Sequence, residues 1–415
     1  MLKNYFKIAF KVMMRNKLFT FISLFGISFT LLFIVVVTAF IDHTLGPVEP
    51  ETQLRRTLSV TMGLLESESG GTTLGPLFSP YFFKKYVKTL ETPQKISLSS
   101  YHHPVVVYLE NKKLKINLKY TDSEFWDILD FAFLEGRSYD KEQVDNIEPV
   151  AVINERVRDE YFLGQEAVGR FMEIEGTRFR VIGVVKNVSL LRIMPYADVW
   201  VPYLFSKSDL DQVTLIGGFP GWFALVMARD KRDFPQIKAE FQSKLQHIEF
   251  PEGRFKRILT NTSSYEEALA RQIFRREDGN IGPFLAILLF LMVLFMILPA
   301  INLVNINISR IIERSSEIGI RKSFGASSLV LVGQFLIENI IITILGSILS
   351  LILAAIILGL INNSGYIAHS HLVINYRVFL TCILIAVFFG IYSGVYPAYK
   401  MSRLQPAEAL QGVRR

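Results

Sequence analysis

The sequence contains 415 residues, of which 50% are hydrophobic and 20% are charged, and its net charge is +7. A mean hydropathy of +0.32 and several charge-poor runs, each long enough to cross about 30 Å of hydrocarbon as a helix, indicate a membrane protein rather than a soluble multidomain chain. The single cysteine excludes an internal disulfide. Basic residues gather beside the ends of the apolar runs, which is typical of membrane topology and not of nucleic-acid binding.

Residues 1–17 predict a basic amphipathic helix. Lys3, Lys7, Lys11 and Arg15 recur every fourth residue, and apolar residues fill the other faces. We expect this elbow helix to lie on the membrane surface, either transmitting motion into the next segment or serving only as a topology anchor. The apolar run that follows exceeds the 7–15 residues of a signal peptide. It therefore predicts a first transmembrane helix over 18–41.

Residues 42–280 have ordinary soluble composition and predict one large α+β domain between the first two membrane helices. Two strand–helix–strand patterns, within 54–101 and 222–262, are typical of a ferredoxin-like, porter-like module. Arg55–Met62, Lys95–Tyr101, Trp222–Ala228 and Arg254–Thr260 are their expected strands, and Glu66–Leu77 is expected to be a loop. Residues 102–221 predict a β-rich insert, and 263–280 predict a stalk leading back to the membrane.

The remaining chain predicts three more transmembrane helices, over 281–308, 328–361 and 378–399. A charged helix loop occupies 309–327, a short loop occupies 362–377, and a basic tail ends the chain at 400–415. Because Lys and Arg concentrate at both termini and in 309–327, we expect these parts to be cytoplasmic and 42–280 to lie outside. The fold class is therefore four membrane helices plus a large extracytoplasmic α+β domain.

Motifs for chemistry are missing from the sequence. There is no G-x-x-x-x-G-K-[ST] phosphate loop, no Cys/His metal pattern and no nucleophile placed beside a base. His369 and His371 in the short outer loop are interpreted as incidental surface residues. We therefore expect no enzyme activity and no cofactor, and any energy must come from a partner.

The charged helix is the strongest functional candidate. Glu313, Glu317 and Arg321 are spaced i, i+4, i+8 and share one helical face. They either form a solvated loop helix stabilised by ion pairs or dock onto a cytoplasmic partner.

At these residues the chain resembles the FtsX/MacB-type ABC transporter permeases. The sequences IIERSSEIGIRKSFGAS at 311–327 and QFLIEN at 334–339 follow the family pattern E-R-x-x-E-I-G-x-R-x-x-G-A. The tail YPAYKMSRLQPAEAL at 396–410 resembles the family's C-terminal end, although Met401 and Ser402 stand where alanines are usual. EGRSY at 135–139 and residues 150–185 resemble its periplasmic motifs.

The resemblance implies a permease dimer, made with a second copy or a paralogue, over separate ABC ATPase subunits, since this sequence begins at the elbow helix. It implies that Glu313, Arg314, Glu317, Gly319 and Arg321 dock the ATPase. It also implies mechanotransmission, in which ATP hydrolysis moves the external domain without a substrate channel through the bilayer.

We therefore expect a permease of the bacterial inner membrane that exports or extrudes a peptide, drug, lipid or lipoprotein. A periplasmic adaptor and an outer-membrane channel are possible further partners, whereas nucleic acid is not. The alternatives are a lipoprotein-releasing permease and an FtsX-like regulator of a cell-wall hydrolase. The large two-lobed external domain favours transport over regulation.

Overall fold

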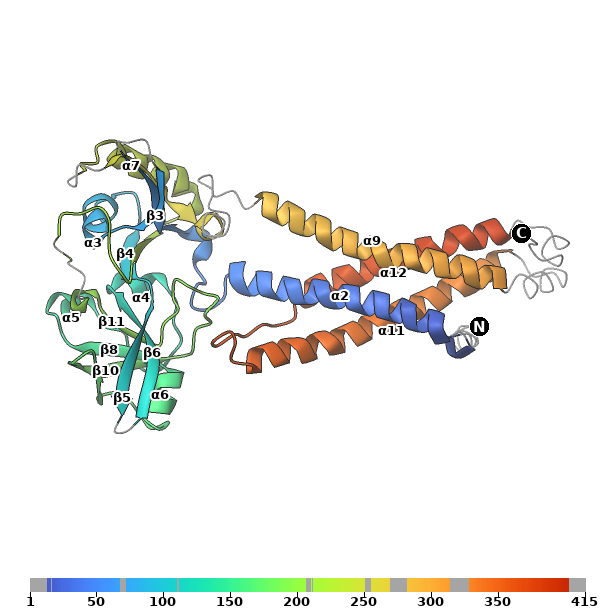
Figure 1. Ribbon diagram of the computed structural model, residues 1–415, viewed down its shortest axis with the longest axis horizontal. Helices are drawn as coiled ribbons and strands as arrows, with labels where there is room; N and C mark the ends of the chain where they lie inside the picture. The colour runs from blue at the N-terminus through green and yellow to red at the C-terminus, as the bar shows by residue number, and fades with distance from the viewer. Residues whose placement is uncertain are drawn as a thin grey trace. The chain divides into compact units, whose positions relative to one another are not determined.

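The computed structural model describes residues 13–15, 17–67, 72–109, 112–206, 210, 212–250, 255–268, 282–313 and 328–402 (Figure 1). The chain divides into two compact units. The helical unit comprises Met1–His43, Pro283–Ser364 and Leu372–Arg415, and the α+β domain comprises Thr44–Gly282 together with Gly365–His371. The loop Gly365–His371 therefore groups with the domain, although it is distant from the rest of the domain in sequence.

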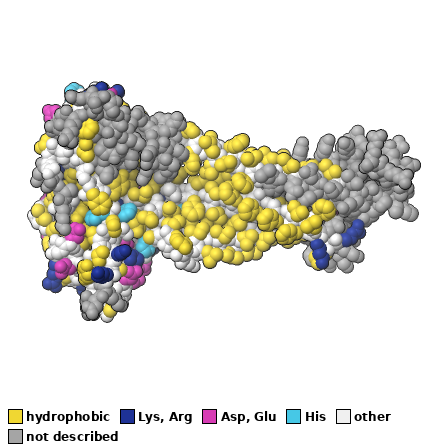
Figure 2. Space-filling model, viewed as in Figure 1, with side chains coloured by type: hydrophobic (Ala, Val, Ile, Leu, Met, Phe, Trp, Pro, Cys, Tyr) yellow, Lys and Arg dark blue, Asp and Glu magenta, His cyan; other side chains and the backbone are white. Residues whose placement is uncertain are grey.

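Four long helices make up the described part of the helical unit: α2 (Lys17–Leu45), α9 (Gly282–Glu313), α11 (Ser328–Asn363) and α12 (Tyr376–Ser402). Two stretches, Lys17–Leu45 and Leu336–Asn363, are long and apolar enough to span a membrane among the described residues. The described apolar stretches of α9 and α12 are shorter, Gly282–Ile297 and Tyr376–Phe388. Hydrophobic side chains cover much of the helices' described surface (Figure 2).

Among the described residues, a glycine and an aromatic pair illustrate the close packing of the helices. A Cβ added to Gly346 of α11 would lie 2.8 Å from the Ile27 side chain of α2. The rings of Phe33 and Phe295 stack at 4.6 Å, and the Thr30 hydroxyl donates a hydrogen bond to the Phe295 carbonyl at 3.2 Å. The absence of a side chain at Gly346 therefore sets how closely α2 and α11 approach, as is usual for small residues in apolar helices.

The first lobe of the domain has two split β–α–β units. β1 (Thr57–Val60), β4 (Lys95–Ser100), β12 (Trp222–Met227) and the two-residue β14 (Ser263–Ser264) form the order β14-β1-β12-β4. The first crossover runs through α3 (Pro80–Phe82) and the π-helical segment η2 (Phe83–Val87), and the second runs through α7 (Phe234–Gln246). In each unit the two strands joined by the crossover are separated by one strand of the other unit, which is the ferredoxin-like arrangement.

One prediction in this lobe is wrong and another is confirmed only in part. Most of the expected loop 66–77 is strand instead, in β2 (Met62–Ser67) and β3 (Thr72–Leu77). The strand expected over 254–260 is present as β13 (Phe255–Leu259), but it does not belong to the β–α–β units. These three strands form their own sheet, in the order β13-β2-β3. The Gly, Ser and Thr residues of 66–77 predicted a loop, but β3, which contains Gly75 and Pro76, is the edge strand of this sheet, where Pro and Gly are tolerated.

The second lobe continues the same large sheet through the pair of β4 with β6 (Lys112–Thr121). Its strands are β5 (His103–Leu109), β6, β7 (Phe133–Gly136), β8 (Val150–Asn154), β9 (Phe171–Ile174), β10 (Thr177–Val185) and β11 (Val199–Pro202). The strand order is β6-β11-β8-β10, with β5 paired to β6 and β9 paired to β10. Because β5 and β9 also contact each other, the sheet curls around a buried apolar core.

Short helices connect these strands along the chain: α4 (Glu124–Ile128), α5 (Lys141–Asp145) and α6 (Glu155–Tyr161). The Asn154 side chain caps α6 by accepting a hydrogen bond from the Val157 N–H at 2.9 Å. The predicted stalk is described only to residue 268, where a helical turn over 265–268 follows β14.

Candidate functional site

The residues predicted to dock an ATPase fall mostly outside the described residues. Glu313 is the last residue of α9, whereas Arg314, Glu317, Gly319 and Arg321 are not described. Of the elbow helix, Lys3, Lys7 and Lys11 also lie outside the described residues, and Arg15 is exposed on the helical stretch 13–15. Both surfaces therefore stay predictions.

A buried polar cluster within the domain was not predicted from the sequence. It is built on residues 189–198, SLLRIMPYAD, which connect β10 to β11 and are called the junction segment below. The Arg192 N–H donates to the Ser189 carbonyl and the Tyr196 N–H to the Arg192 carbonyl, both at 2.9 Å. The Trp200 indole of β11 donates to the Pro195 carbonyl at 3.2 Å. These bonds fold the segment into successive turns that point polar side chains inward.

Arg192 ties the junction segment to the chain that follows α2. Its Nη1 lies 2.7 Å from Glu51 Oε2, and its Nη2 donates to the Gly46 carbonyl at 2.7 Å. Both charged side chains are 1% exposed. Burial raises the pKa of the Glu51 carboxyl, while the Arg192 guanidinium acts to lower it. A charge pair excluded from water in this way is costly to break on one side only.

Lys119 of β6 is fully buried and bonds to the turn of the junction segment that follows Arg192. Its ammonium donates to the carbonyls of Ile193, at 3.3 Å, and Met194, and lies 5.3 Å from the centre of the Phe223 ring. Burial lowers the pKa of Lys119 to about 7, and the Glu51 carboxylate partly offsets this effect.

The residues that lead toward α9 share this environment. Tyr265, in the helical turn after β14, is 9% exposed and belongs to the buried cluster that Leu45 and Leu54 pack against. Burial raises the pKa of the Tyr265 hydroxyl, and the Glu51 carboxylate adds to the effect. The chain after α2 and the chain before α9 are thus fixed in one hydrophobic cluster of the domain.

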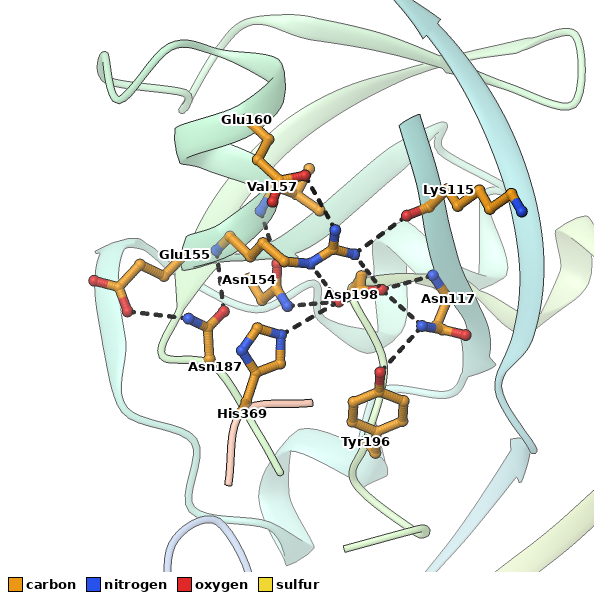
Figure 3. Close-up of polar contacts among 11 residues, drawn as sticks. Lys115, Asn117, Asn154, Glu155, Val157, Glu160, Asn187, Tyr196, Asp198 and His369 are labelled. Carbon is orange, nitrogen blue, oxygen red and sulfur yellow. Dashed lines mark hydrogen bonds and ion pairs between the residues drawn. The ribbon is translucent and has the colours of Figure 1, made fainter. Parts of the chain in front are cut away.

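The second polar centre is Asp198, at the end of the junction segment (Figure 3). Its carboxylate accepts hydrogen bonds from the Asn117 backbone N–H at 2.7 Å and from the side-chain amides of Asn117 at 2.9 Å and Asn154 at 2.8 Å. Arg156 Nη2 lies 2.7 Å from Oδ2, and Asp198 is fully buried. Burial opposes ionisation, but the His369 ring, the Arg156 guanidinium and the Asn117 N–H outweigh it and hold the pKa of Asp198 well below its ordinary value.

The loop Gly365–His371, which links α11 to α12, contacts the domain at this centre. The Leu190 N–H donates to the Ala368 carbonyl at 2.9 Å. His369 Nε2 lies 3.9 Å from Asp198 Oδ1, and the His369 side chain is only 15% exposed. Ser370 is 2% exposed. The interpretation of His369 as an incidental surface histidine is therefore wrong.

The sequence carried a weak signal for this cluster. Arg192 stands within the apolar stretch LLRIMP, and Asp198 directly precedes the apolar strand VWVP. A charge in an apolar run is buried only with a partner, but that partner cannot be found locally. Among the described residues no group of His, Cys, Asp or Glu could hold a metal ion. The described cluster can fasten segments together, and nothing in it is arranged for a reaction.

Comparison with known proteins gives the family. Residues 20–244 match the family model of the MacB-like periplasmic core domain, and residues 289–406 match that of the FtsX-like permease C-terminal domain. The first match alone spans more than half of the chain. The chain belongs to the MacB/FtsX-type ABC transporter permeases. It is therefore a membrane protein, and the junction segment lies within the core domain of this permease.

Its relatives include permeases and longer fused proteins. The uncharacterized ABC transporter permease YvrN of Bacillus subtilis is 25% identical over 83% of this chain and 83% of its own length. The macrolide export ATP-binding/permease protein MacB of Haemophilus ducreyi is 24% identical over 98% of this chain. The chain spans only 55% of that MacB.

Among solved structures, the extracellular domain of the ABC-type transporter YknZ from Gram-positive bacteria is similar. It is 14% identical with a TM-score of 0.37, and the similarity covers 49% of this chain and 98% of the YknZ domain.

Proposed function

We propose that this permease crosses a bacterial inner membrane four times, through α2, α9, α11 and α12. α9 and α12 contain 32 and 27 residues, so each reaches beyond the roughly 30 Å of the hydrocarbon core at 1.5 Å per residue. The basic residues of 1–17, 309–327 and 400–415 support a cytoplasmic location for both termini and for the loop between α9 and α11. The α+β domain is then outside.

The energy comes from a separate ABC ATPase that docks on Glu313, Arg314, Glu317, Gly319 and Arg321, and the permease works as a dimer. ATP binding and hydrolysis move the helices, and the external domain moves with them. One observation carries this mechanism: the junction segment is bonded both to the chain after α2, through Arg192, and to the loop between α11 and α12, through Leu190. Movement of either connecting segment would therefore reach the junction segment inside the domain.

The substrate is a hydrophobic or amphipathic molecule taken up outside or from the outer leaflet, such as a peptide, drug, lipid or lipoprotein. The similarity to a macrolide export protein supports transport. The match to the MacB-like periplasmic core domain favours this role over regulation of a cell-wall hydrolase.

The test is a native pull-down of the tagged full chain from mild detergent, with mass spectrometry of the proteins that accompany it. We expect an ABC ATPase to co-purify, and we expect Glu317→Lys and Arg321→Glu to remove it because these charges form the docking face. Arg377→Glu, the same kind of charge reversal at an exposed residue in the first turn of α12, is the matched control and should keep the ATPase.

Recovery of the chain without any ATPase across several detergents would contradict the proposal. Loss of the ATPase in the Arg377→Glu control as well would show that the effect is not specific to the docking helix. An ATPase that stays bound while transport by Glu317→Lys is unimpaired would refute the assigned docking residues.

A further inference from the structure

His369 occupies a strained backbone conformation beside a buried carboxylate. Its φ is +54°, in the left-handed region that residues other than glycine seldom adopt. In the same loop, Gly365 also has a positive φ, of +71°, which is ordinary for glycine but unusual for histidine. In this conformation the His369 ring lies 3.9 Å from Asp198 Oδ1 (Figure 3). Such strain persists only where surrounding contacts hold it.

The carboxylates close to Arg156 outnumber the single positive charge of its guanidinium. Arg156 pairs with Asp198 at 2.7 Å and with Glu160 at 3.1 Å, so two carboxylates share one guanidinium. Glu155 accepts a hydrogen bond from Asn187 on the same side, and the Tyr196 hydroxyl accepts one from Asn117. His102, whose ring lies 4.8 Å from that of Tyr196, also faces Asp198, but burial lowers its pKa to about 4. Among these described neighbours, His369 is then the remaining imidazole that can gain a positive charge near neutral pH.

We propose that protonation of His369 fastens the loop Gly365–His371 to the domain through Asp198. His369 and Asp198 are then positioning residues, and the linker between α11 and α12 has an attachment that depends on the pH of the extracytoplasmic space. The meaning of this attachment for transport rests on the proposed function. The attachment itself can be measured without an ATPase or a substrate.

The direction of the pH effect follows from the two groups. Asp198 stays ionised because its pKa is held low. Imidazole is the side chain that ordinarily changes charge between about pH 5 and pH 8. At the acidic end, the His369 imidazolium and the Asp198 carboxylate attract each other and add to the Leu190–Ala368 backbone bond. At the basic end, only the backbone bond and the packing of Ser370 hold the loop.

The test measures how often Ser370 becomes exposed. Ser370 is 2% exposed, and its hydroxyl has no hydrogen-bond partner, so Ser370→Cys places a buried thiol there without breaking a polar contact. The full chain is used with Cys382→Ser, which removes its single native cysteine. Maleimide labelling of Ser370→Cys is divided by that of Tyr366→Cys, a site in the same loop that is 92% exposed, to correct for the thiolate fraction at each pH.

We expect this labelling ratio to rise roughly fivefold between pH 6 and pH 8. That factor corresponds to the loss of one ion pair whose free energy is at the upper end of the range measured for partly exposed pairs. His369→Gln should give the high ratio at both pH values. His369→Lys, which keeps a positive charge throughout, should give the low ratio at both. His371→Gln, an exposed histidine of the same loop, is the matched control and should respond to pH like the parent.

A ratio that stays constant from pH 6 to pH 8 in the parent overturns the proposal. A pH response that survives in His369→Gln, or that disappears equally in His371→Gln, also overturns it. Each of these results would leave the docking of an ATPase untouched, and a failed pull-down would leave the labelling result standing.

Discussion

Replacing Arg192 by methionine should destabilise the α+β domain more than any exposed charge change. The guanidinium lies 2.7 Å from Glu51, and both side chains are 1% exposed. Methionine keeps the apolar length of the side chain but leaves the Glu51 carboxylate buried without its partner. Removing one member of a buried pair costs about 3–5 kcal/mol. For a domain of this size that corresponds to a fall in Tm of roughly 6–20 °C.

The pH dependence of this loss identifies its cause. Burial already raises the pKa of Glu51 above its ordinary value, and Arg192 is the main group that lowers it, with a smaller contribution from Lys119. Without Arg192, the folded-state pKa of Glu51 rises further above the unfolded value of about 4.5. The destabilisation of Arg192→Met is then fully present above that raised pKa and fades as the pH falls toward the unfolded value. The loss should therefore be larger at pH 8 than at pH 5.

Intrinsic tryptophan fluorescence measures this unfolding selectively in the full chain. All three tryptophans, Trp126, Trp200 and Trp222, lie in the domain. Arg232→Met is the matched control, since Arg232 is 95% exposed and only 3.9 Å from Asp230, a weak surface pair. A loss below about 1 kcal/mol for Arg192→Met, or an equal loss at pH 5 and pH 8, would refute the reasoning.

Because burial lowers the pKa of Lys119 to about 7 from an unfolded value near 10.5, domain stability should rise by about 1.4 kcal/mol per pH unit from pH 7 toward pH 10. Lys119→Met should flatten this slope in denaturant titrations followed by fluorescence, and an unchanged slope would contradict the assignment. An alanine Cβ at Gly136 (φ +64°) would lie 2.0 Å from a carbonyl oxygen of β10, whereas at Gly169 (φ +86°) it would meet nothing within 4 Å. Gly136→Ala should therefore cost more than the roughly 1–2 kcal/mol of left-handed strain expected for Gly169→Ala, and equal Tm values would count against the geometry. Gly346→Ala should weaken the packing of α2 on α11 by about 1–3 kcal/mol. The measurement is size-exclusion chromatography after heating in detergent, where the monodisperse peak should be lost at a lower temperature. Gly359→Ala, with nothing within 4 Å of its Cβ, should leave the peak unchanged.

Local patterns in the sequence predicted the elements whose stabilising contacts are local. The apolar runs placed α2 and α11 within a few residues of their observed bounds, because a helix forms its backbone hydrogen bonds within its own segment. The β-rich insert predicted over 102–221 includes the antiparallel pair of β5 and β6, where Val105 lies opposite Ile116 and the side chains alternate between the two faces. The motif at 311–327 led to the family, which the comparisons establish.

Patterns of the same kind failed where the partner strand is distant. β2 pairs with β13 across almost two hundred residues, with Leu64 opposite Leu259. The strand over 254–260 was predicted, but its partner and the separate sheet could not be derived from neighbouring residues. The glycines of 66–77 predicted a loop, because local propensity is overridden once a strand finds an edge to pair with.

The amino-acid sequence was sufficient for the family, for the apolar helices and for an α+β domain inserted between the first two of them. It could not reveal the junction segment, because Arg192 meets Glu51 from 141 residues away and Asp198 meets His369 from another part of the chain. A buried charge requires a partner but does not specify where in the sequence that partner lies. Folding of the chain brings these groups together, because burying the surrounding apolar residues closes the long loops between them.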